Sequence, residues 1–218
     1  MKTVSPPGVA AEELLRGAHR QSYRYPPGFR GFTAALRLEA GSGQSEGSVE
    51  VELEDGKVIA RVEGADDAWA AEQIRSLVAH RLGRRYEDGD GLHEKRLVED
   101  GDALGALVEL DDSMESSYRV DRGAIALVTR RPGGHRFSIA VQSRMQAPGG
   151  TVVPTAFAVF YWAADDRLEA SEAYVDAYVA EGAFLLPAER LVVRADDGGI
   201  LSRRISLSGH VLRTDGHA

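Results

Sequence analysis

The chain has 218 residues, with 26 Lys and Arg, 34 Asp and Glu, 43% hydrophobic residues and no cysteine. This length fits one large domain or two small ones, and the missing cysteines exclude disulfides, thiolate metal sites, iron–sulfur ligation and a cysteine nucleophile. The negative charge is concentrated in residues 38–128, which argues against a nucleic-acid-binding protein.

Two further features concern the membrane. The first 15 residues lack the apolar run of a signal peptide, and the longest apolar stretch, 156–164, is too short to cross a bilayer. We therefore expect a cytoplasmic protein that does not insert into a membrane.

Two segments have helical spacing. The first runs from residue 10 to 23, has Glu12 and Glu13 in its first turn, and ends before Pro26 and Pro27. The second runs from residue 66 to 82, with Asp66 or Asp67 as N-cap and Gly83 as its stop. Its apolar stripe consists of Trp69, Ile74, Leu77, Val78 and Leu82.

Most of the remaining sequence alternates between apolar and polar residues, which predicts half-buried strands. The strands at 49–53 and 58–62 are joined by a two-residue turn at Asp55 and Gly56. Similar runs continue to residue 212 and give about eleven strands in all.

The short links between these strands predict an antiparallel sheet, so the fold class is mainly β, or α+β. So many strands do not stay flat with a wet hydrophobic face. We expect the sheet to curl into an open barrel or half-barrel, with the N-terminal helix and the second helix covering its concave face. The longest linker is 41–48, so residues 1–218 are predicted to form a single domain, as a monomer or homodimer.

Several blocks of the chain carry a family resemblance. The opening block, 19–36, contains Tyr23, Tyr25, Phe29, Gly31, Phe32, Thr33 and Ala34, and the block 78–91 contains His80, Arg81, Arg84 or Arg85, Tyr86 and Glu87. Together with 114–120, 182–187 and 203–212, they resemble the uncharacterised domain-of-unknown-function family 3386 of cyanobacteria and plant plastids. The chain departs from that pattern at Tyr25, Arg30 and Glu115, as a distant branch would.

The strand order and the closing hairpin are also similar to the open-barrel lipoprotein carriers of bacterial envelopes. That fold additionally hosts a cofactor-free enzyme of indole-pigment assembly. The resemblance implies a concave sheet with a hydrophobic cavity, and it implies no particular substrate.

The candidate catalytic residues are His80, Glu87 and Tyr86. A histidine beside arginines and a carboxylate has the ingredients of a general base next to an anion clamp. The same residues also fit the ordinary end of a helix, where carbonyls attract cations and Glu87 pairs with an arginine.

The candidate ligand-binding residues are mostly aromatic. Tyr23, Tyr25 and Phe29 would line the mouth of a cavity, or alternatively fix the first helix onto the sheet. A carboxylate on the ligand would meet Arg81 or Arg85. Tyr118 and Tyr161 complete the set, and the strand around Tyr161 has aromatic residues on both faces, more than a single core layer needs.

Known motifs for other chemistries are missing from the sequence. No G-x-S-x-G elbow surrounds the serines, no nucleotide-binding loop is present, and the histidines lack metal-ligand spacing. The segment from Asp88 to Gly91 begins like a calcium loop but lacks the later ligands, so it is interpreted as an acidic turn. We predict no metal and no cofactor.

The sequence thus favours a carrier or binding protein for a small apolar or aromatic ligand. One alternative is a cofactor-independent biosynthetic enzyme that performs a cyclisation or isomerisation by acid–base catalysis. A second alternative is a structural or assembly factor, which would have an exposed apolar patch in place of a pocket.

Overall fold

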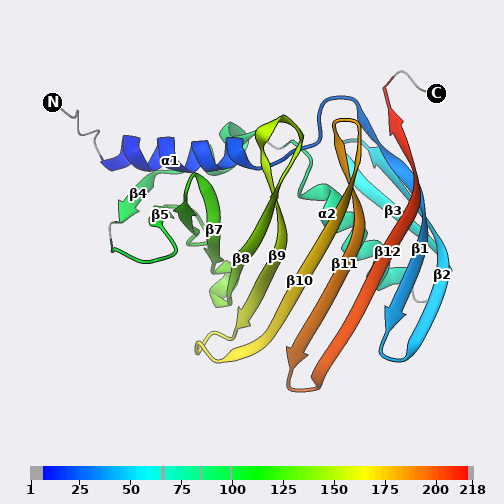
Figure 1. Cartoon of the computed structure of the whole chain (residues 1–218). Coiled ribbons are helices and arrows are strands. Elements are labelled where there is room, and N and C mark those ends of the chain that lie inside the picture. The colour runs from blue at the N-terminus through cyan, green and yellow to red at the C-terminus, as the bar shows by residue number, and fades with distance from the viewer. Residues whose placement is uncertain (1–6, 65–66, 84, 99, 216–218) are drawn as a thin grey trace. The chain divides into compact units, whose positions relative to one another are not determined.

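The computed structural model describes residues 7–64, 67–83, 85–98 and 100–215. Two α-helices and twelve strands make up most of this part of the chain (Figure 1). In chain order they are α1 (Pro7–Gln21), β1 (Phe29–Ala40), β2 (Gly43–Glu54), β3 (Lys57–Gly64), α2 (Asp67–Ala79), β4 (Lys95–Val98), β5 (Ala106–Leu110), β6 (Ser117–Asp121), β7 (Ala124–Arg130), β8 (Arg136–Gln146), β9 (Val152–Trp162), β10 (Leu168–Glu181), β11 (Phe184–Asp196) and β12 (Gly199–Thr214). Short 3-10 helices η1 (Tyr86–Asp88) and η2 (Asp90–Leu92) precede β4.

The strands form one sheet in the order β3-β2-β1-β12-β11-β10-β9-β8-β7-β6-β5-β4. Neighbours in this order are consecutive in the chain except for β1 and β12, and the described strand pairings are antiparallel. The sequence prediction of a mainly β, antiparallel fold with two helices is therefore confirmed. The order starts at β3 and ends at β4, so the sheet has two edges and is not a closed barrel.

The described residues pack into two compact units. Unit 1 comprises 7–23, 85–98, 100–173 and 195–199, and unit 2 comprises 24–64, 67–83, 174–194 and 200–215. The strands β10, β11 and, through Gly199, β12 contribute residues to both units.

In unit 1, α1 packs on β4, β6 and β7. The helix presents Ala11, Leu15 and Ala18 toward the protein, each fully buried, because they recur at intervals of three or four residues. Leu15 packs in one cluster with Val108 and Tyr118 of the sheet. Burying a leucine side chain contributes about 1.5–3 kcal/mol, so this stripe fixes the helix over the strands.

Unit 2 is built on the ladder of β12, β1, β2 and β3, with α2 packed on β3. Asp55 and Gly56 both have positive φ, 49° and 74°, as the predicted two-residue turn between β2 and β3 requires. At Gly31 of β1 a Cβ atom would lie 1.9 Å from the carbonyl oxygen of Val51 on β2. Only glycine fits this close approach of two backbones.

Two local predictions differ from the structure. Residues 43–48 were expected in a loop and instead belong to β2, where Ser45 pairs with Leu38 and Glu46 with Arg37. Gly and Ser have weak strand propensity, so the neighbouring strand β1 decides their conformation. The alternating pattern also predicts a strand over 92–98, but the strand begins only at Lys95, because residues 90–92 form η2.

The predicted cap at Asp66 and the arginine Arg84 lie outside the described residues. Neither α-helix in the described part of the chain is long and apolar enough to span a membrane.

Candidate functional site

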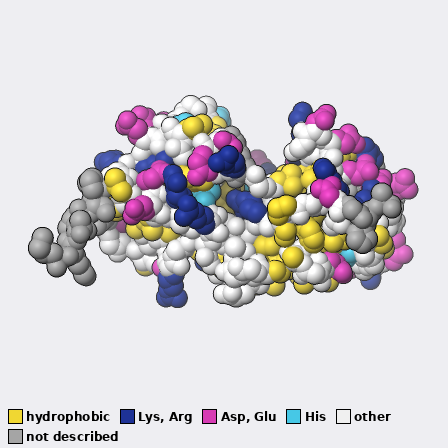
Figure 2. Space-filling model, turned by 90° about the horizontal axis from the view of Figure 1, so that it is seen from above, with side chains coloured by type: hydrophobic (Ala, Val, Ile, Leu, Met, Phe, Trp, Pro, Cys, Tyr) yellow, Lys and Arg dark blue, Asp and Glu magenta, His cyan; other side chains and the backbone are white. Residues whose placement is uncertain are grey.

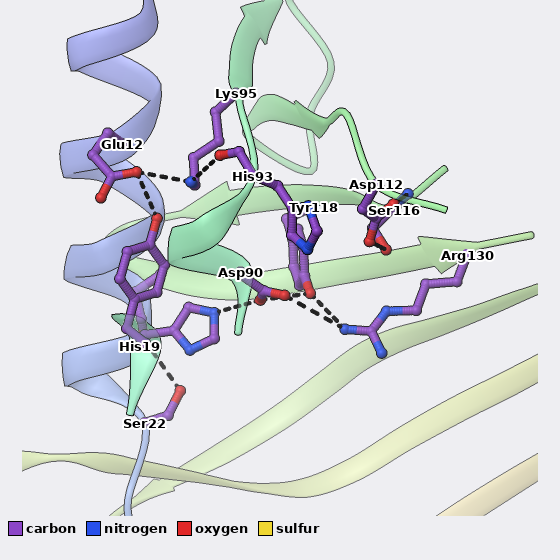
Figure 3. Close-up of polar contacts among 12 residues, drawn as sticks. Glu12, His19, Ser22, Asp90, His93, Lys95, Asp112, Ser116, Tyr118 and Arg130 are labelled. Carbon is purple, nitrogen blue, oxygen red and sulfur yellow. Dashed lines mark hydrogen bonds and ion pairs between the residues drawn. The ribbon is translucent and has the colours of Figure 1, made fainter. Parts of the chain in front are cut away.

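A polar network in unit 1 joins three elements to η2 (Figure 3). Asp90 of η2 is its centre and accepts hydrogen bonds from His19 Nε2 at 2.9 Å and from the Tyr118 hydroxyl at 2.7 Å. The Tyr118 oxygen in turn accepts from Nη2 of Arg130, at 2.7 Å, and this nitrogen is 3.9 Å from Asp90. His19 comes from the last turn of α1, Tyr118 from β6 and Arg130 from the end of β7.

Asp90 is ionised in this network. Burial alone would raise the pKa of Asp90, but the hydrogen bonds from His19 and Tyr118 outweigh it and lower the pKa below its usual value. Burial raises the pKa of Tyr118, so the hydroxyl keeps its proton and donates a hydrogen bond to the carboxylate. The Asp90 carboxylate therefore accepts hydrogen bonds from two side chains.

A second carboxylate, Glu12 of α1, ties the same helix to β4 and η1. It is 2.8 Å from Lys95 Nζ, 2.6 Å from Arg16 and accepts from the Tyr86 hydroxyl at 2.9 Å. Burial would raise the pKa of Glu12, but the hydrogen bonds from Lys95, Arg16 and Tyr86 lower it to about 2. The Tyr86 ring meets the His19 ring edge to face at 5.1 Å, which connects the two carboxylate clusters.

Unit 2 contains a different kind of network, centred on a buried ion pair. Arg190 of β11 donates through Nε and Nη2 to Asp176 of β10, at 2.8 and 2.7 Å, and both side chains are almost fully buried. Arg190 also donates to Gln73 of α2 at 3.2 Å and lies over the Tyr174 ring at 4.9 Å. This fork geometry suits a guanidinium facing a carboxylate.

Further cations surround that ion pair. Arg81 donates to the Tyr178 hydroxyl at 3.0 Å, and its Nε is buried without a hydrogen-bond partner among the described residues. Burial and the charge of Arg81 lower the pKa of Arg24. Partial desolvation, followed by the charges of Arg81, Arg190 and Arg24, lowers the pKa of His80. Three guanidinium groups thus act on one imidazole.

The three candidate catalytic residues are divided between the two units. Tyr86 is buried in unit 1, where its hydroxyl is bound to Glu12. Glu87 is exposed in the same unit, 3.6 Å from Arg16. His80 is exposed in unit 2, directly after α2, and its Nδ1 is 2.7 Å from the carbonyl oxygen of Ser76 in that helix. Of the three residues, only Tyr86 and Glu87 belong to the same unit.

The aromatic ligand-binding candidates are mainly buried. Tyr25 and Phe29 stack at 3.9 Å in unit 2, and the Tyr25 amide donates to the Arg81 carbonyl at 2.8 Å, so these three candidates lie together. Tyr23 is buried in unit 1, and its amide donates to the carbonyl of Val152 on β9.

The remaining ligand-binding candidates all lie in unit 1. Tyr118 belongs to the Asp90 network, and half-buried Tyr161 donates to Glu172 at 3.1 Å. Arg85 is exposed and 3.9 Å from Glu87, so its charge is partly compensated at the surface.

Sequence reasoning missed the residues at the centres of both networks, which are His19, Asp90 and Arg130 in unit 1 and Gln73, Asp176 and Arg190 in unit 2. One signal was available for His19, which follows Leu15 by four residues and so shares the apolar face of its helix. A second was available for Asp176, which shares its strand alternation with Tyr174 and Tyr178. The sequence pattern does not show which strand supplies the partner of either residue.

Two further observations concern metal ligands and a pocket. No group of three or more His, Asp or Glu side chains arranged to hold a metal ion occurs among the described residues. A pocket of about 210 Å³ lies elsewhere in unit 2, and none of the predicted site residues lines it. Its lining residues are Leu38, Ala40, Gly43, Gln44, Ser45 and Arg203.

These features define a mainly β protein with one open antiparallel sheet, two helices and a polar network in each unit. The family model described as "Protein of unknown function (DUF3386)" matches residues 7–212, so the chain belongs to the DUF3386 family. This confirms the family resemblance. No curated protein matches the chain.

Several solved structures are similar to the chain at low identity. A Vibrio parahaemolyticus domain named for outer membrane lipoprotein sorting is 8% identical, with 97% of this chain and 95% of that chain covered and a TM-score of 0.42. A DUF1329 family protein from Desulfovibrio piger is 10% identical, with 98% and 95% covered and a TM-score of 0.33. A LolA superfamily protein from Nitrosomonas europaea is 12% identical, with 96% and 94% covered and a TM-score of 0.28.

The expected similarity to lipoprotein-carrier structures is thus found.

Proposed function

We propose that the protein binds a small, largely apolar ligand that carries an anionic group, and that the anion is held by Arg81 in unit 2. The observation that supports this proposal is the crowding of like charges around Arg81. Burial and then the charges of Arg81, Arg190 and Arg24 lower the pKa of His80, and Arg81 retains a buried Nε donor with no hydrogen-bond partner among the described residues.

An anion fits this arrangement for two physical reasons. A negative charge relieves the repulsion between neighbouring guanidinium groups, and it gives Nε the acceptor that a buried donor needs. Tyr178 already fixes the Arg81 side chain through Nη2, so little conformational entropy is lost when an anion binds.

The apolar part of the ligand would lie beside the buried aromatic side chains near Arg81. Tyr25, whose amide bonds the Arg81 carbonyl, stacks on Phe29, and Phe29 contacts the Phe184 ring at 6.1 Å. Figure 2 shows hydrophobic side chains gathered over unit 2 on the face seen from above. The proposal includes the curved sheet expected from the sequence, whose concave face would accommodate the ligand body.

Calorimetric titration with decanoate and with decanol tests the proposal, because the two share an apolar chain and differ in charge. We expect decanoate to bind measurably tighter than decanol. Arg81→Gln should weaken decanoate binding by about tenfold, the equivalent of one charge-assisted contact, and should leave decanol binding unchanged.

Arg75→Gln is the matched control, because Arg75 lies on α2, which ends at Ala79 just before Arg81, and pairs at the surface with Glu72. It should bind decanoate like the unmodified protein. Equal affinity of the protein for decanoate and decanol, or an Arg81→Gln variant with unchanged decanoate affinity, would contradict the proposal.

A further inference from the structure

We infer that His19 is the general base of a separate site in unit 1, which moves a proton on a small organic acid. The inference rests on the hydrogen-bond geometry of His19, Asp90, Tyr118 and Arg130, and it is independent of the anion site proposed around Arg81 in unit 2. Figure 3 shows these side chains converging from α1, η2, β6 and β7.

The first step concerns the tautomer of His19. An ionised carboxylate only accepts hydrogen bonds, so His19 Nε2, at 2.9 Å from Asp90, carries the proton of that contact. The other ring nitrogen, Nδ1, then holds a lone pair. It makes no hydrogen bond among the described residues, and the side chain is 22% exposed. A basic nitrogen is therefore available to a small molecule.

The second step concerns how Asp90 supports this base. When Nδ1 accepts a proton, the ring becomes an imidazolium. The negative charge of the Asp90 carboxylate, which lies beside Nε2, stabilises this cation. The carboxylate is held in place from its other side by the Tyr118 hydroxyl at 2.7 Å. Asp90 and Tyr118 are thus positioning residues, and His19 is the group that would contact the substrate.

The third step concerns the charge that develops on the substrate. Arg130 is fixed through Nη2 by Tyr118, its Nε is buried without a hydrogen-bond partner among the described residues, and 30% of its side chain is exposed. A fixed cation with unused donors binds a carboxylate and stabilises an enolate oxygen. His19 and Arg130 both lie near Asp90. We therefore infer that the substrate is a carbon acid with a carbonyl next to its C–H bond, because the base would remove the proton and the guanidinium would stabilise the enolate.

The proposed reaction is balanced without an oxidant or a second substrate. The C–H bond adjacent to the carbonyl breaks, its proton forms the N–H bond on His19 Nδ1, and the electron pair moves to the carbonyl oxygen as an enolate. The imidazolium then returns a proton to carbon and regenerates the neutral base. In deuterated water, the returned proton is a deuteron.

A role limited to attaching α1 would not need this geometry. Glu12 already ties the helix to Lys95 and Tyr86, and Leu15 packs in the core beneath it. The ring of His19 adds one hydrogen bond to the network and leaves its second nitrogen unused by the described residues.

Proton NMR in deuterated water tests the inference, with pyruvate and phenylpyruvate as probes. We expect the protein to accelerate deuterium incorporation next to the carbonyl of at least one probe by about 100-fold or more over buffer, because general acid–base catalysis typically contributes about 10²–10⁴-fold. His19→Gln should reduce the rate to that of buffer. His135→Gln, a change at an exposed histidine of the same unit, should leave the rate unchanged.

Two more variants separate positioning from a structural role. Asp90→Asn should lower the saturating exchange rate and leave the half-saturating probe concentration unchanged, whereas Arg130→Gln should raise that concentration. Urea unfolding of each variant shows whether it is folded under the assay conditions.

The inference is overturned if the protein exchanges neither probe faster than buffer does, or if folded His19→Gln exchanges as fast as the unmodified protein. Loss of decanoate binding in Arg81→Gln with normal exchange would show that the two sites are independent.

Discussion

The two units handle buried charge in opposite ways. In unit 1 the carboxylates Asp90 and Glu12 each collect several donors, so the acid is the centre and the donors surround it. In unit 2 the Asp176 carboxylate is matched by Arg190, and more guanidinium groups gather around that pair. Unit 1 thus places several donors around each carboxylate, whereas unit 2 places several guanidinium groups near one ion pair.

This difference indicates what each unit can bind. A carboxylate that accepts a hydrogen bond from one nitrogen of an imidazole leaves a lone pair on the other nitrogen, which suits proton transfer. A group of guanidinium ions around one carboxylate attracts anions. Both networks contain tyrosines, arginines and an aspartate. They differ in that donors surround a carboxylate in unit 1, whereas cations lie near an ion pair in unit 2.

The largest expected effect tests the buried pair of unit 2. Asp176→Asn removes the charge partner of Arg190 while nearly keeping the shape of the side chain. Because breaking a buried ion pair leaves an uncompensated charge, we expect a loss of about 3–5 kcal/mol in the free energy of unfolding, measured in urea. The double variant Asp176→Leu with Arg190→Met should recover much of that loss. A loss below about 1 kcal/mol in the single variant would show that the pair is not the centre of the unit.

A smaller effect tests the acid-centred network of unit 1. The pKa of Glu12 is about 2 in the folded protein and ordinarily 4.5, so its stabilisation is fully present above pH 4.5 and disappears as the pH falls toward 2. Glu12→Gln should cost about 1 kcal/mol at neutral pH, discounted for solvent screening at a side chain that is 30% exposed.

The decisive measurement for Glu12 is the free energy of unfolding as a function of pH. The curves of the unmodified protein and of Glu12→Gln should converge below pH 4.5. A constant gap across the whole range would mean that the Glu12 charge does not stabilise the fold.

The smallest effect sets the scale for a surface pair. Arg75 and Glu72 of α2 lie 2.6 Å apart with about half of each side chain exposed. Pairs of this kind contribute about 0.3–0.5 kcal/mol, so Arg75→Gln should change the free energy of unfolding by no more than that. A loss as large as that of Glu12→Gln would remove the contrast between the networks and ordinary surface pairs.

Much of the fold was predictable from local patterns. The alternation in β1 and the turn at Asp55 and Gly56 depend on neighbouring residues, and so does the apolar stripe of Ile74, Leu77 and Val78. Segment 43–48 was mispredicted because its glycines and serines follow their partner strand rather than their own preference.

The sites were harder to predict. Tyr118, Arg81 and Tyr25 were named from the sequence and do lie in or beside the two networks, whereas the central acids were not named. Asp90 is 71 residues from His19 in the sequence, and Asp176 is 14 from Arg190. No local spacing connects such partners.

The sequence by itself determined the class of fold, the antiparallel connections and the family to which the chain belongs. These follow from periodicities of two and 3.6 residues, from turn residues and from short blocks, all of which are local properties. Tertiary structure decided which acids became buried and which donors reached them. Burial and hydrogen-bond partners set the pKa values of Glu12, Asp90 and His80, and neither is encoded in any single segment.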